Sequence, residues 1–321
     1  MTEFLYDLIP WGYRILLEVE TWRCRAGNVL FIGLTAIGAE EGYLALIAVM
    51  FWCVNKPVAR GLSFVYLLST YLNMSLKFFF DIPRPTSSMS SLSRVLDEHG
   101  ITSRVAPLMH ETSPSWPSNH AQAAMVVWGY LARMLRRRWL WIVAPLLIAL
   151  IGFSRIYIGV HFPQDVISGW LIGFLVLLIW LLPDKPVRRI IGRIPFGLQI
   201  MILLLAAYFV PVAMPVEYTD KILGAMAGLG IGYLLEGRTV GFDVKGSTGR
   251  LLTRAVLGLI VVFCLKLGFD RVLEVLKGTD GGYYRQSMVS LAYLAMGLAV
   301  AYALPLLFLK VGLARKEVNR T

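Results

Sequence analysis

The feature that most constrains the fold of this chain is a series of long apolar runs that repeat along most of its length. A helix needs roughly 20 mostly apolar residues to cross the hydrocarbon core of a bilayer. The composition agrees, because 57% of the residues are hydrophobic and only 16% are charged, values that soluble domains rarely approach. We therefore predict an all-α fold, a polytopic transmembrane helical bundle of about nine spans. The candidate spans lie near residues 29–54, 61–80, 119–135, 139–159, 165–182, 198–214, 221–236, 251–269 and 288–309.

The basic residues indicate how these spans are oriented. The formal net charge is +11, but the Lys and Arg residues gather in short segments between spans, which is typical of cytoplasmic loops. Nine spans alternate without conflict if the cytoplasmic segments are 55–60, 133–139, 184–189, 236–250 and 313–320. We therefore expect an integral, multi-pass protein of the bacterial inner membrane that is surrounded by membrane lipids and has no nucleic-acid partner. Its N-terminus lies outside and its C-terminus inside.

The chain divides into three regions by composition. Residues 1–25 mix polar and apolar positions at roughly helical spacing and carry acidic residues, which argues against a cleavable signal and predicts an amphipathic helix on the membrane surface. Residues 26–190 form a core region, and residues 191–321 add further transmembrane helices. Three cysteines, Cys24, Cys53 and Cys264, are scattered along the chain, so no disulfide framework and no metal cluster is expected.

Three polar clusters lie at span ends that this topology places on the outer face. Taken alone, each has an ordinary explanation: cations that reach the headgroups, a helix start, and a His–Asp pair on one helix face. Their convergence favours a functional site, because ionisable groups at membrane depth are rare and generally functional. The polar members are Lys77 and Arg84 in KFFFDIPRP, Ser118, Asn119 and His120 in SPSWPSNH, and Arg155, His161 and Asp165 in SRIYIGVHFPQD.

These residue types predict a phosphate site. Lysine and arginine attract an anion, guanidinium groups match phosphate oxygens, and a helix start at the second cluster adds backbone N–H donors. The cations already supply the charge that would stabilise a transition state, so we expect no metal and no other cofactor. Asp165 lies one helical turn after His161 and would fix its tautomer, which suits His161 as nucleophile, while His120 would exchange protons.

Read in order, the motifs K-x6-RP (77–85), PSNH (117–120) and SR-x5-H-x3-D (154–165) closely resemble the signature of the type 2 phosphatidic acid phosphatase superfamily. The resemblance covers about a third of the chain. It implies a helical bundle and metal-independent dephosphorylation through a phosphohistidine. It also implies the roles of the residues: His161 as nucleophile, Asp165 as its partner, His120 as acid and base, and Lys77, Arg84, Ser118 and Arg155 as phosphate ligands.

One residue departs from this signature. The second motif usually reads PSGH, and Asn119 stands in place of the glycine. Asparagine is the residue that best tolerates the positive φ that glycine permits. We therefore expect activity to be kept, with Asn119 either contributing its side chain to substrate binding or narrowing the pocket.

Two further segments leave alternatives open. The connection over residues 81–117 is longer than usual, and its piece SSLSRVLDEHG is either a short helix or a flexible linker. In YLLEGRTVGF, Glu236 and Arg238 either pair at a span end or belong to spans that shape a lipid entry groove or a dimer contact. This LExR element and PSNHAQ resemble the branch of the superfamily that includes sphingosine-phosphate phosphatases.

The leading interpretation is an integral membrane lipid-phosphate phosphatase that hydrolyses a phosphomonoester or pyrophosphate of a lipid at the outer membrane face. A phosphotransferase with a lipid phosphate donor is an alternative within the superfamily, whereas the apolar spans argue against a soluble vanadium-dependent haloperoxidase. A non-catalytic anion or lipid transporter is the alternative from another class, although the chain shows no convincing internal repeat. The native lipid and the oligomeric state stay open.

Overall fold

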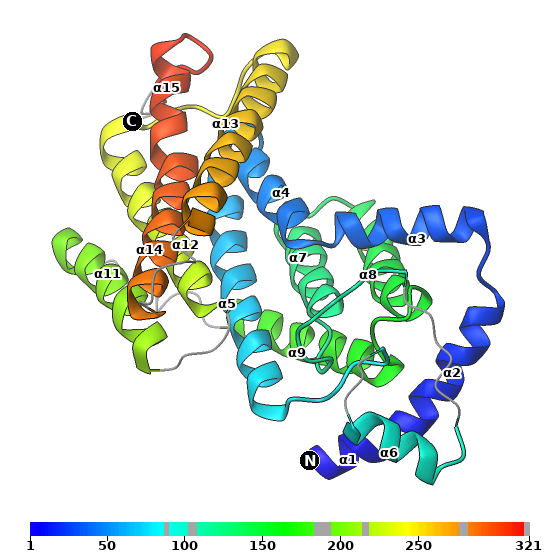
Figure 1. Cartoon of the computed structure of the whole chain (residues 1–321). Helices are drawn as coiled ribbons and strands as arrows, with labels where there is room; N and C mark the ends of the chain where they lie inside the picture. The colour runs from blue at the N-terminus through cyan, green and yellow to red at the C-terminus, as the bar shows by residue number, and fades with distance from the viewer. Residues whose placement is uncertain (87–89, 102–107, 183–193, 214–217, 276–281, 318–321) are drawn as a thin grey trace. The chain divides into compact units, whose positions relative to one another are not determined.

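The computed structural model is built from helices (Figure 1). It describes residues 1–86, 90–101, 108–182, 194–213, 218–275 and 282–317. No strand forms within these ranges, and a single bridge joins Phe242 to Lys316. The predicted all-α class is therefore confirmed for the part of the chain that the structure describes.

The chain folds into two compact units that each combine separate stretches of sequence. The first unit comprises Met1–Tyr43 and Leu68–Leu182, and the second comprises Leu44–Leu67 and Pro183–Thr321. Residues 44–67 of the expected core region thus group with the C-terminal region. The division into regions 1–25, 26–190 and 191–321 stays a prediction.

The first unit carries all three polar clusters. Its helices are α1 (Thr2–Asp7), α2 (Ile9–Thr21), α3 (Arg25–Ile37), α6 (Ser90–Glu98), α7 (Asn119–Leu135), α8 (Leu140–Tyr157), α9 (Pro163–Leu181), the start of α4 (Glu40–Cys53) and the C-terminal half of α5 (Lys56–Phe80). Two glycines, Gly169 and Gly173, let α9 approach α7 closely. A Cβ added to Gly169 would lie 2.6 Å from Ser118 O, and one added to Gly173 would lie 2.7 Å from Gln122 O. This packing holds the beginning of both helices together.

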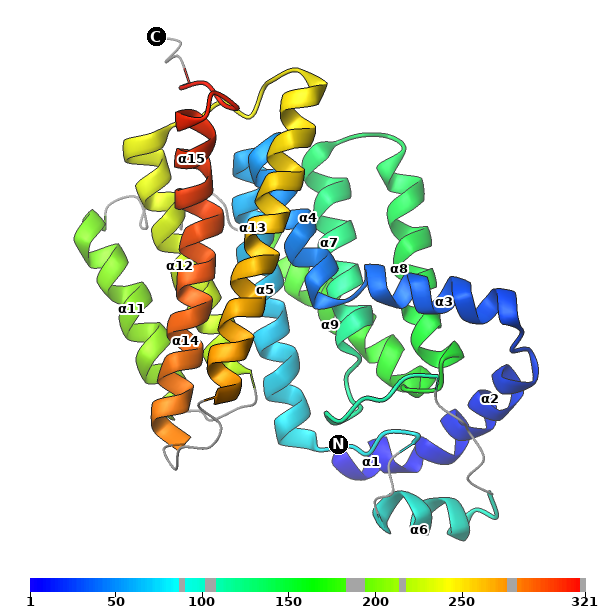
Figure 2. The same cartoon turned by 45° about the horizontal axis from the view of Figure 1, so that its top comes forward.

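The N-terminal helices pack against the long connection between α5 and α7. Ile9, Tyr13 and Leu16 of α2 form one buried cluster with Leu92 and Leu96 of α6 and with Phe162, the residue that precedes α9. Figure 2 shows α6 alongside α1 and α2. Of the two alternatives for SSLSRVLDEHG, the structure has the helix. In place of the single amphipathic helix expected over residues 1–25 the structure has two helices, α1 and α2, and the place of this region on the membrane surface stays a prediction.

By length and apolar composition, four of the described helical segments are long enough to cross a membrane, or five if a bent pair counts as one span. The four are α8, α9, Thr248–Val272 and Ser287–Lys310. The bent pair is α3 with α4, whose axes differ by 53°. The expected total of about nine spans is not confirmed, because several of the other helices are shorter or more polar.

The span expected over residues 29–54 is broken by a bend between two helices. Helix α3 ends at Ile37 with Gly38 as its C-cap, and α4 begins with Glu40 and Glu41. Acidic residues stabilise a helix start, since the first turn carries the positive end of the macrodipole. Gly38 also fits the corner, because a Cβ there would lie 2.6 Å from the side chain of Ile151.

The second unit packs α12 (Thr219–Leu235) against α14 (Gly282–Leu298). A Cβ on Gly224 or Gly228 would overlap a backbone carbonyl oxygen of α14, so only glycine permits this contact. The other elements of the unit are α11 (Phe196–Ala213), the π-helical turns η1 (Glu236–Val240) and η3 (Ala299–Ala303), α13 (Thr248–Val275), α15 (Leu304–Lys310) and the parts of α4 and α5 that precede Leu68.

The LExR element has different partners from those expected. Glu236 is fully buried and forms ion pairs with Lys56, at 3.2 Å, and with Arg60. Arg238 instead lies 3.8 Å from the ring centre of Phe196. The interpretation of Glu236 and Arg238 as a pair is therefore wrong, because Glu236 fastens η1 to the start of α5.

Candidate active site

The sequence-predicted cations and the His–Asp pair meet at one end of the first unit. Lys77 lies in the last turn of α5 and Arg155 in the last turn of α8, while Asp165 lies in the first turn of α9. Arg84 and His161 are in the connections after α5 and after α8. All five side chains are at most 5% exposed. Four ionisable side chains and a histidine thus share one buried region, a placement that proteins usually reserve for function.

The His161 imidazole is held on both sides. Its Nδ1 lies 3.3 Å from Asp165 Oδ2, and its Nε2 lies 3.1 Å from Arg84 Nη1. Because arginine can only donate, Nε2 must accept, and we assign the proton to Nδ1. Asp165 Oδ2 also accepts hydrogen bonds from Phe162 N, at 2.9 Å, and from the Ser115 hydroxyl. His161 is thus oriented with the lone pair of Nε2 toward the arginine.

Burial and charge keep this imidazole neutral. Burial, together with the positive charges of Arg84, Lys77 and Arg155, holds the pKa of His161 well below 6.5. A neutral ring with no proton on Nε2 is the form that can attack an electrophile or accept a proton, once Arg84 no longer donates to that nitrogen.

Two of the cations are held by backbone carbonyls of the loop before α7 and of the connection before α9. Arg84 donates to Ser113 O at 2.6 Å and to Val160 O at 2.8 Å, and Lys77 donates to Pro114 O and to Ser115 O. These carbonyl partners are neutral, and the charged partner of Arg84 is Glu111, whose Oε2 lies 3.7 Å from Arg84 Nη2. The charge of the two cations stays available to an anion, because carbonyl dipoles do not neutralise it.

Arg155 differs from the other two cations because much of its guanidinium has no partner. Its Nη2 lies 2.5 Å from Glu111 Oε1, whereas its Nε and Nη1 are buried without a hydrogen-bond partner. The Ser118 hydroxyl and Asp165 Oδ1 are also buried and unpaired. Buried donors without partners are costly and call for an explanation. An anionic ligand with several oxygens, such as a phosphate group, would pair the open donors of Arg155 and Ser118.

The second motif lies beside this group at the start of α7. Ser118 is the N-cap residue of α7, and its amide donates to Asp165 O at 3.0 Å. His120 is half-buried and has no hydrogen-bond partner within the described part of the chain. Its ring lies close to Gly38, because a Cβ added to that glycine would be 3.5 Å from His120 Cδ2. The imidazole of His120 is therefore free to exchange a proton with a bound molecule.

Asn119 does not use the conformation that its replacement of glycine suggested. It is the first residue of α7, whereas the described non-glycine residues with positive φ are Asp81, Arg136 and Tyr218. The tolerance of asparagine for positive φ is therefore not needed at this position, because helix α7 begins there. The role of the Asn119 side chain in substrate binding stays a prediction.

Several residues at the site were missed by the sequence reasoning. Glu111 bridges Arg155 and Arg84, and Ser115 donates to Asp165. A buried network behind the second motif was also missed: Asn73 Nδ2 donates to Gln122 Oε1 at 2.8 Å and to Pro117 O at 3.2 Å. Ser115 lies within SPSWPSNH, and Gln122 within PSNHAQ, so their closeness to a motif was the available signal. For Glu111, the only signal in the sequence was an acidic residue within a polar loop.

Comparisons with known proteins relate this chain to one family of phosphatases. The model of the PAP2 superfamily matches residues 59–186, and the model of the PAP2 superfamily phosphatase transmembrane extension matches residues 221–316. Phosphatidylglycerophosphatase B of Bacillus subtilis is 28% identical over 173 residues, which cover 50% of this chain and 77% of that protein. Lipid phosphate phosphatase delta of Arabidopsis thaliana is 25% identical over 228 residues, or 64% of this chain and 52% of that protein.

Among solved structures, Aquifex aeolicus LpxE is 27% identical, with a TM-score of 0.45 over 52% of this chain and 93% of that chain. This chain spans about half the length of the Arabidopsis relative. The residues matched by the first family model include all three polar clusters, and those matched by the second lie in the C-terminal region. From its matched residues and its three motifs, this chain belongs to the PAP2 superfamily of phosphatases.

Proposed function

We propose that this chain is a lipid-phosphate phosphatase that hydrolyses a phosphomonoester or diphosphate of a lipid through a phosphohistidine at His161, without a metal or another cofactor. Its family makes it a phosphate-ester hydrolase of the membrane. The observation that carries the proposed mechanism is the unprotonated Nε2 of His161, which accepts a hydrogen bond from Arg84, in a buried region that also holds the unpaired donors of Arg155 and Ser118.

In the first step, His161 Nε2 attacks the phosphorus atom and the bond from phosphorus to the lipid oxygen breaks. Arg84 moves its Nη1 donor from Nε2 to a phosphate oxygen, while Arg155 and Lys77 balance the developing charge. Asp165 stabilises the imidazole as it becomes positive, because it already accepts from Nδ1. His120, neutral in the empty site, takes up a proton when the phosphate anion binds, because a nearby negative charge favours the imidazolium, and it gives this proton to the departing lipid oxygen.

In the second step, water attacks the phosphohistidine and the bond from nitrogen to phosphorus breaks. His120 takes one proton from the attacking water, so both residues return to their starting forms as inorganic phosphate leaves. Each phosphate oxygen keeps cationic partners throughout, which is how this site would lower the barrier without a metal.

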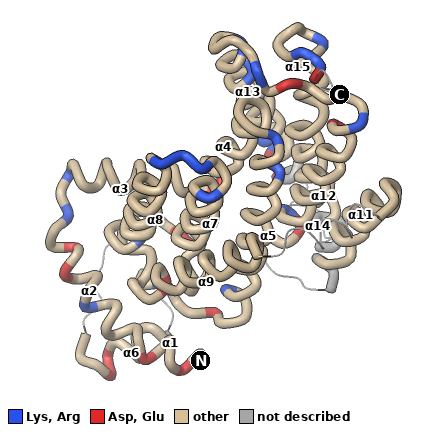
Figure 3. The backbone as a smooth tube through the Cα atoms, turned by 180° about the vertical axis from the view of Figure 1, so that it is seen from behind, with Lys and Arg blue, Asp and Glu red and all other residues tan. Residues whose placement is uncertain are grey.

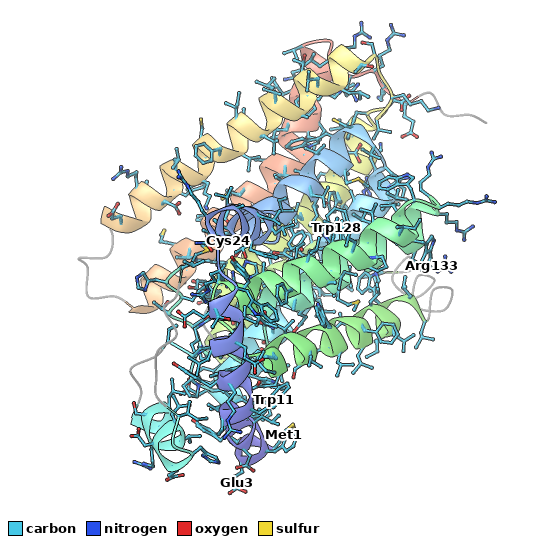
Figure 4. The ribbon with its side chains drawn as sticks, turned by 90° about the vertical axis from the view of Figure 1, so that its right-hand side faces the viewer. Met1, Glu3, Trp11, Cys24, Trp128 and Arg133 are labelled. Atoms are coloured by element: carbon cyan, nitrogen blue, oxygen red, sulfur yellow. The ribbon has the colours of Figure 1, made fainter. Side chains whose placement is uncertain are left out.

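The position of the site in the first unit supports an extracytoplasmic location. Helix α7 runs from the site to Leu135, Arg136–Arg138 follow, and α8 returns to the site. Figure 3 shows this basic connection at the opposite end of the two helices from α1 and α6, and Figure 4 shows Arg133 similarly far from Met1 and Glu3. Basic connections are retained in the cytoplasm. The site would therefore face the periplasm if the membrane is the bacterial inner membrane.

A lipid is the substrate class that fits a site at the end of apolar helices. Its phosphate would lie at headgroup level while its tail stays in the bilayer. Phosphatidylglycerophosphatase B acts on phosphatidylglycerophosphate by its name, and this lipid is one candidate substrate. Phosphatidate, polyprenyl diphosphate and a sphingoid-base phosphate are the others.

The test is phosphate release by the purified protein in detergent, with EDTA present, across this lipid panel. We expect release from at least one lipid and its loss in His161→Ala, with unchanged size-exclusion behaviour of the variant. Activity in His161→Ala, or a requirement for a divalent metal, would overturn the mechanism. Analysis of products on added alcohol acceptors separates hydrolysis from the phosphotransferase alternative, because a transferase would place the phosphate on the acceptor.

A further inference from the structure

An acidic residue of the outer connection reaches into the cationic site. Glu111 lies between α6 and α7, with its Oε1 2.5 Å from Arg155 Nη2 and its Oε2 3.7 Å from Arg84 Nη2. The Glu111 side chain is 28% exposed, whereas the Arg155 and Arg84 side chains are only 1% and 5% exposed. The carboxylate therefore meets the two buried arginines from the solvent side of the site.

We propose that Glu111 is an internal anion that holds the place of a phosphate oxygen in the empty site and that the substrate phosphate must displace. This inference rests on the proposed function. It makes Glu111 a specificity-determining residue, because its carboxylate competes with the incoming anion for the same guanidinium groups. A carboxylate can stand in for phosphate here, since both present paired oxygens to the planar donors of arginine.

The charges around the site support displacement rather than shared occupancy. The site holds three cations and two anions that interact electrostatically. The cations are Lys77, Arg84 and Arg155, and the anions are Asp165 and Glu111. With neutral histidines, the empty site therefore has an excess of one positive charge. A phosphomonoester dianion would leave an excess of one negative charge if Glu111 stayed, and none if Glu111 left. The site is thus matched to a dianion only after the carboxylate has moved away.

The surroundings of Glu111 permit this movement. Burial alone would raise the pKa of Glu111, but the charges of Arg155, Arg84 and Lys77 hold it below 4.5, so the residue is an anion at neutral pH. Its partial exposure gives the displaced carboxylate access to water. Arg155 keeps its Nε and Nη1 donors open beside the occupied Nη2. A phosphate can therefore bind the open edge first and then take the position of the carboxylate.

The experiment measures anion affinity directly, by the rise in melting temperature of the detergent-solubilised protein with inorganic phosphate or orthovanadate. We expect Glu111→Gln to bind both anions about tenfold more tightly, because a competing charge is removed. KM for the lipid phosphate should fall by a similar factor. The value of kcat should stay equal or fall, since product phosphate would leave more slowly. Glu98→Gln is the matched control: it removes an exposed carboxylate of α6 and should leave both affinities unchanged.

Equal or weaker anion binding in Glu111→Gln would overturn the proposal and make Glu111 a residue that only positions Arg155. Glu111→Asp keeps the charge on a shorter side chain and should give an intermediate affinity. Failure of both variants to fold would also overturn the proposal, because Glu111 would then be a structural counter-ion. The anion series is independent of catalysis. If the wild type released no phosphate from any lipid, the proposed function would fail while tighter anion binding by Glu111→Gln would still support the internal anion.

Discussion

At the scale of single residues, Asp165 connects the fold to the chemistry. One carboxylate oxygen accepts from the amide of Phe162 at the start of α9, from Ser115 and from His161. The same contacts that begin the helix therefore set the tautomer of His161, the proposed nucleophile. An aspartate in this position stabilises the imidazolium that forms during attack.

We predict that Asp165→Asn lowers kcat about 10³- to 10⁴-fold, because the amide would favour the wrong tautomer of His161. KM should change much less, since the phosphate ligands remain. Steady-state kinetics on the best lipid substrate measure both constants. Asp81→Asn, at an exposed residue with positive φ that asparagine also tolerates, should have no effect. A kcat within tenfold of the wild type in Asp165→Asn would contradict the assigned tautomer.

The neutral state of His161 also predicts a pH dependence of stability. Its pKa lies well below 6.5 in the folded chain, so below pH 6.5 the unfolded chain binds more protons at this residue. His161 therefore contributes stability above pH 6.5, and this contribution is lost as the pH falls toward the folded-state pKa. Between about pH 7.5 and about pH 5.5, the melting temperature of His161→Asn should fall less than that of the wild type. His99→Asn, at an exposed histidine, should keep the wild-type slope, and equal slopes for all three proteins would refute the idea.

The motif residues could be predicted from the sequence because their spacing is local. His161 and Asp165 are one helical turn apart, and Ser118 begins an apolar helix. Glu111 could not be assigned in the same way, because its contact with Arg155 depends on the path of a long connection between α6 and α7. Residue spacing within a loop does not fix where its side chains point.

At the scale of elements, apolar runs predicted helices well and their breaks poorly. The run over residues 29–54 contains two adjacent glutamates near its middle, and the structure begins a new helix there. Hydropathy averaged over a span hides such a pair, whereas the macrodipole makes it a favourable helix start. The π-helical turn η1 was not predicted from the sequence either, because Glu236 is held there by Lys56 and Arg60, which are distant in sequence.

The packing of α12 on α14 gives a prediction for the second unit. A Cβ on Gly228 would overlap the carbonyl oxygen of Leu294, so Gly228→Ala must push the helices apart. We expect a loss of about 1–3 kcal/mol, the usual cost of overpacking, seen as a lower melting temperature in detergent. Gly268→Ala in α13 is the control, because nothing lies within 4 Å of the added Cβ. It should be neutral or gain about 0.5–1 kcal/mol. Similar effects of the two substitutions would argue against close packing of α12 on α14.

At the scale of the whole molecule, the charges of the connections bear on which side of the membrane the chemistry takes place. In the first unit, the proposed phosphate site and the basic Arg136–Arg138 connection lie at opposite ends of α7 and α8. If basic connections stay in the cytoplasm, then α6, which belongs to the connection leading into the second motif, lies on the outer face. The side of the membrane therefore determines which pool of lipid phosphates the site can reach.

Cysteine labelling tests this orientation. In a background with Cys24, Cys53 and Cys264 replaced by serine, a membrane-impermeant maleimide should modify Asp97→Cys on α6 in intact spheroplasts. It should modify Arg137→Cys only after the membrane is opened. Both positions are exposed, and serine can take over the N-cap role of Cys24 at α3. The reverse labelling pattern would place the site in the cytoplasm and exclude lipids whose phosphates are confined to the outer leaflet. The contacts of Lys77, Arg84 and Arg155 in the proposed phosphate site would stand unchanged.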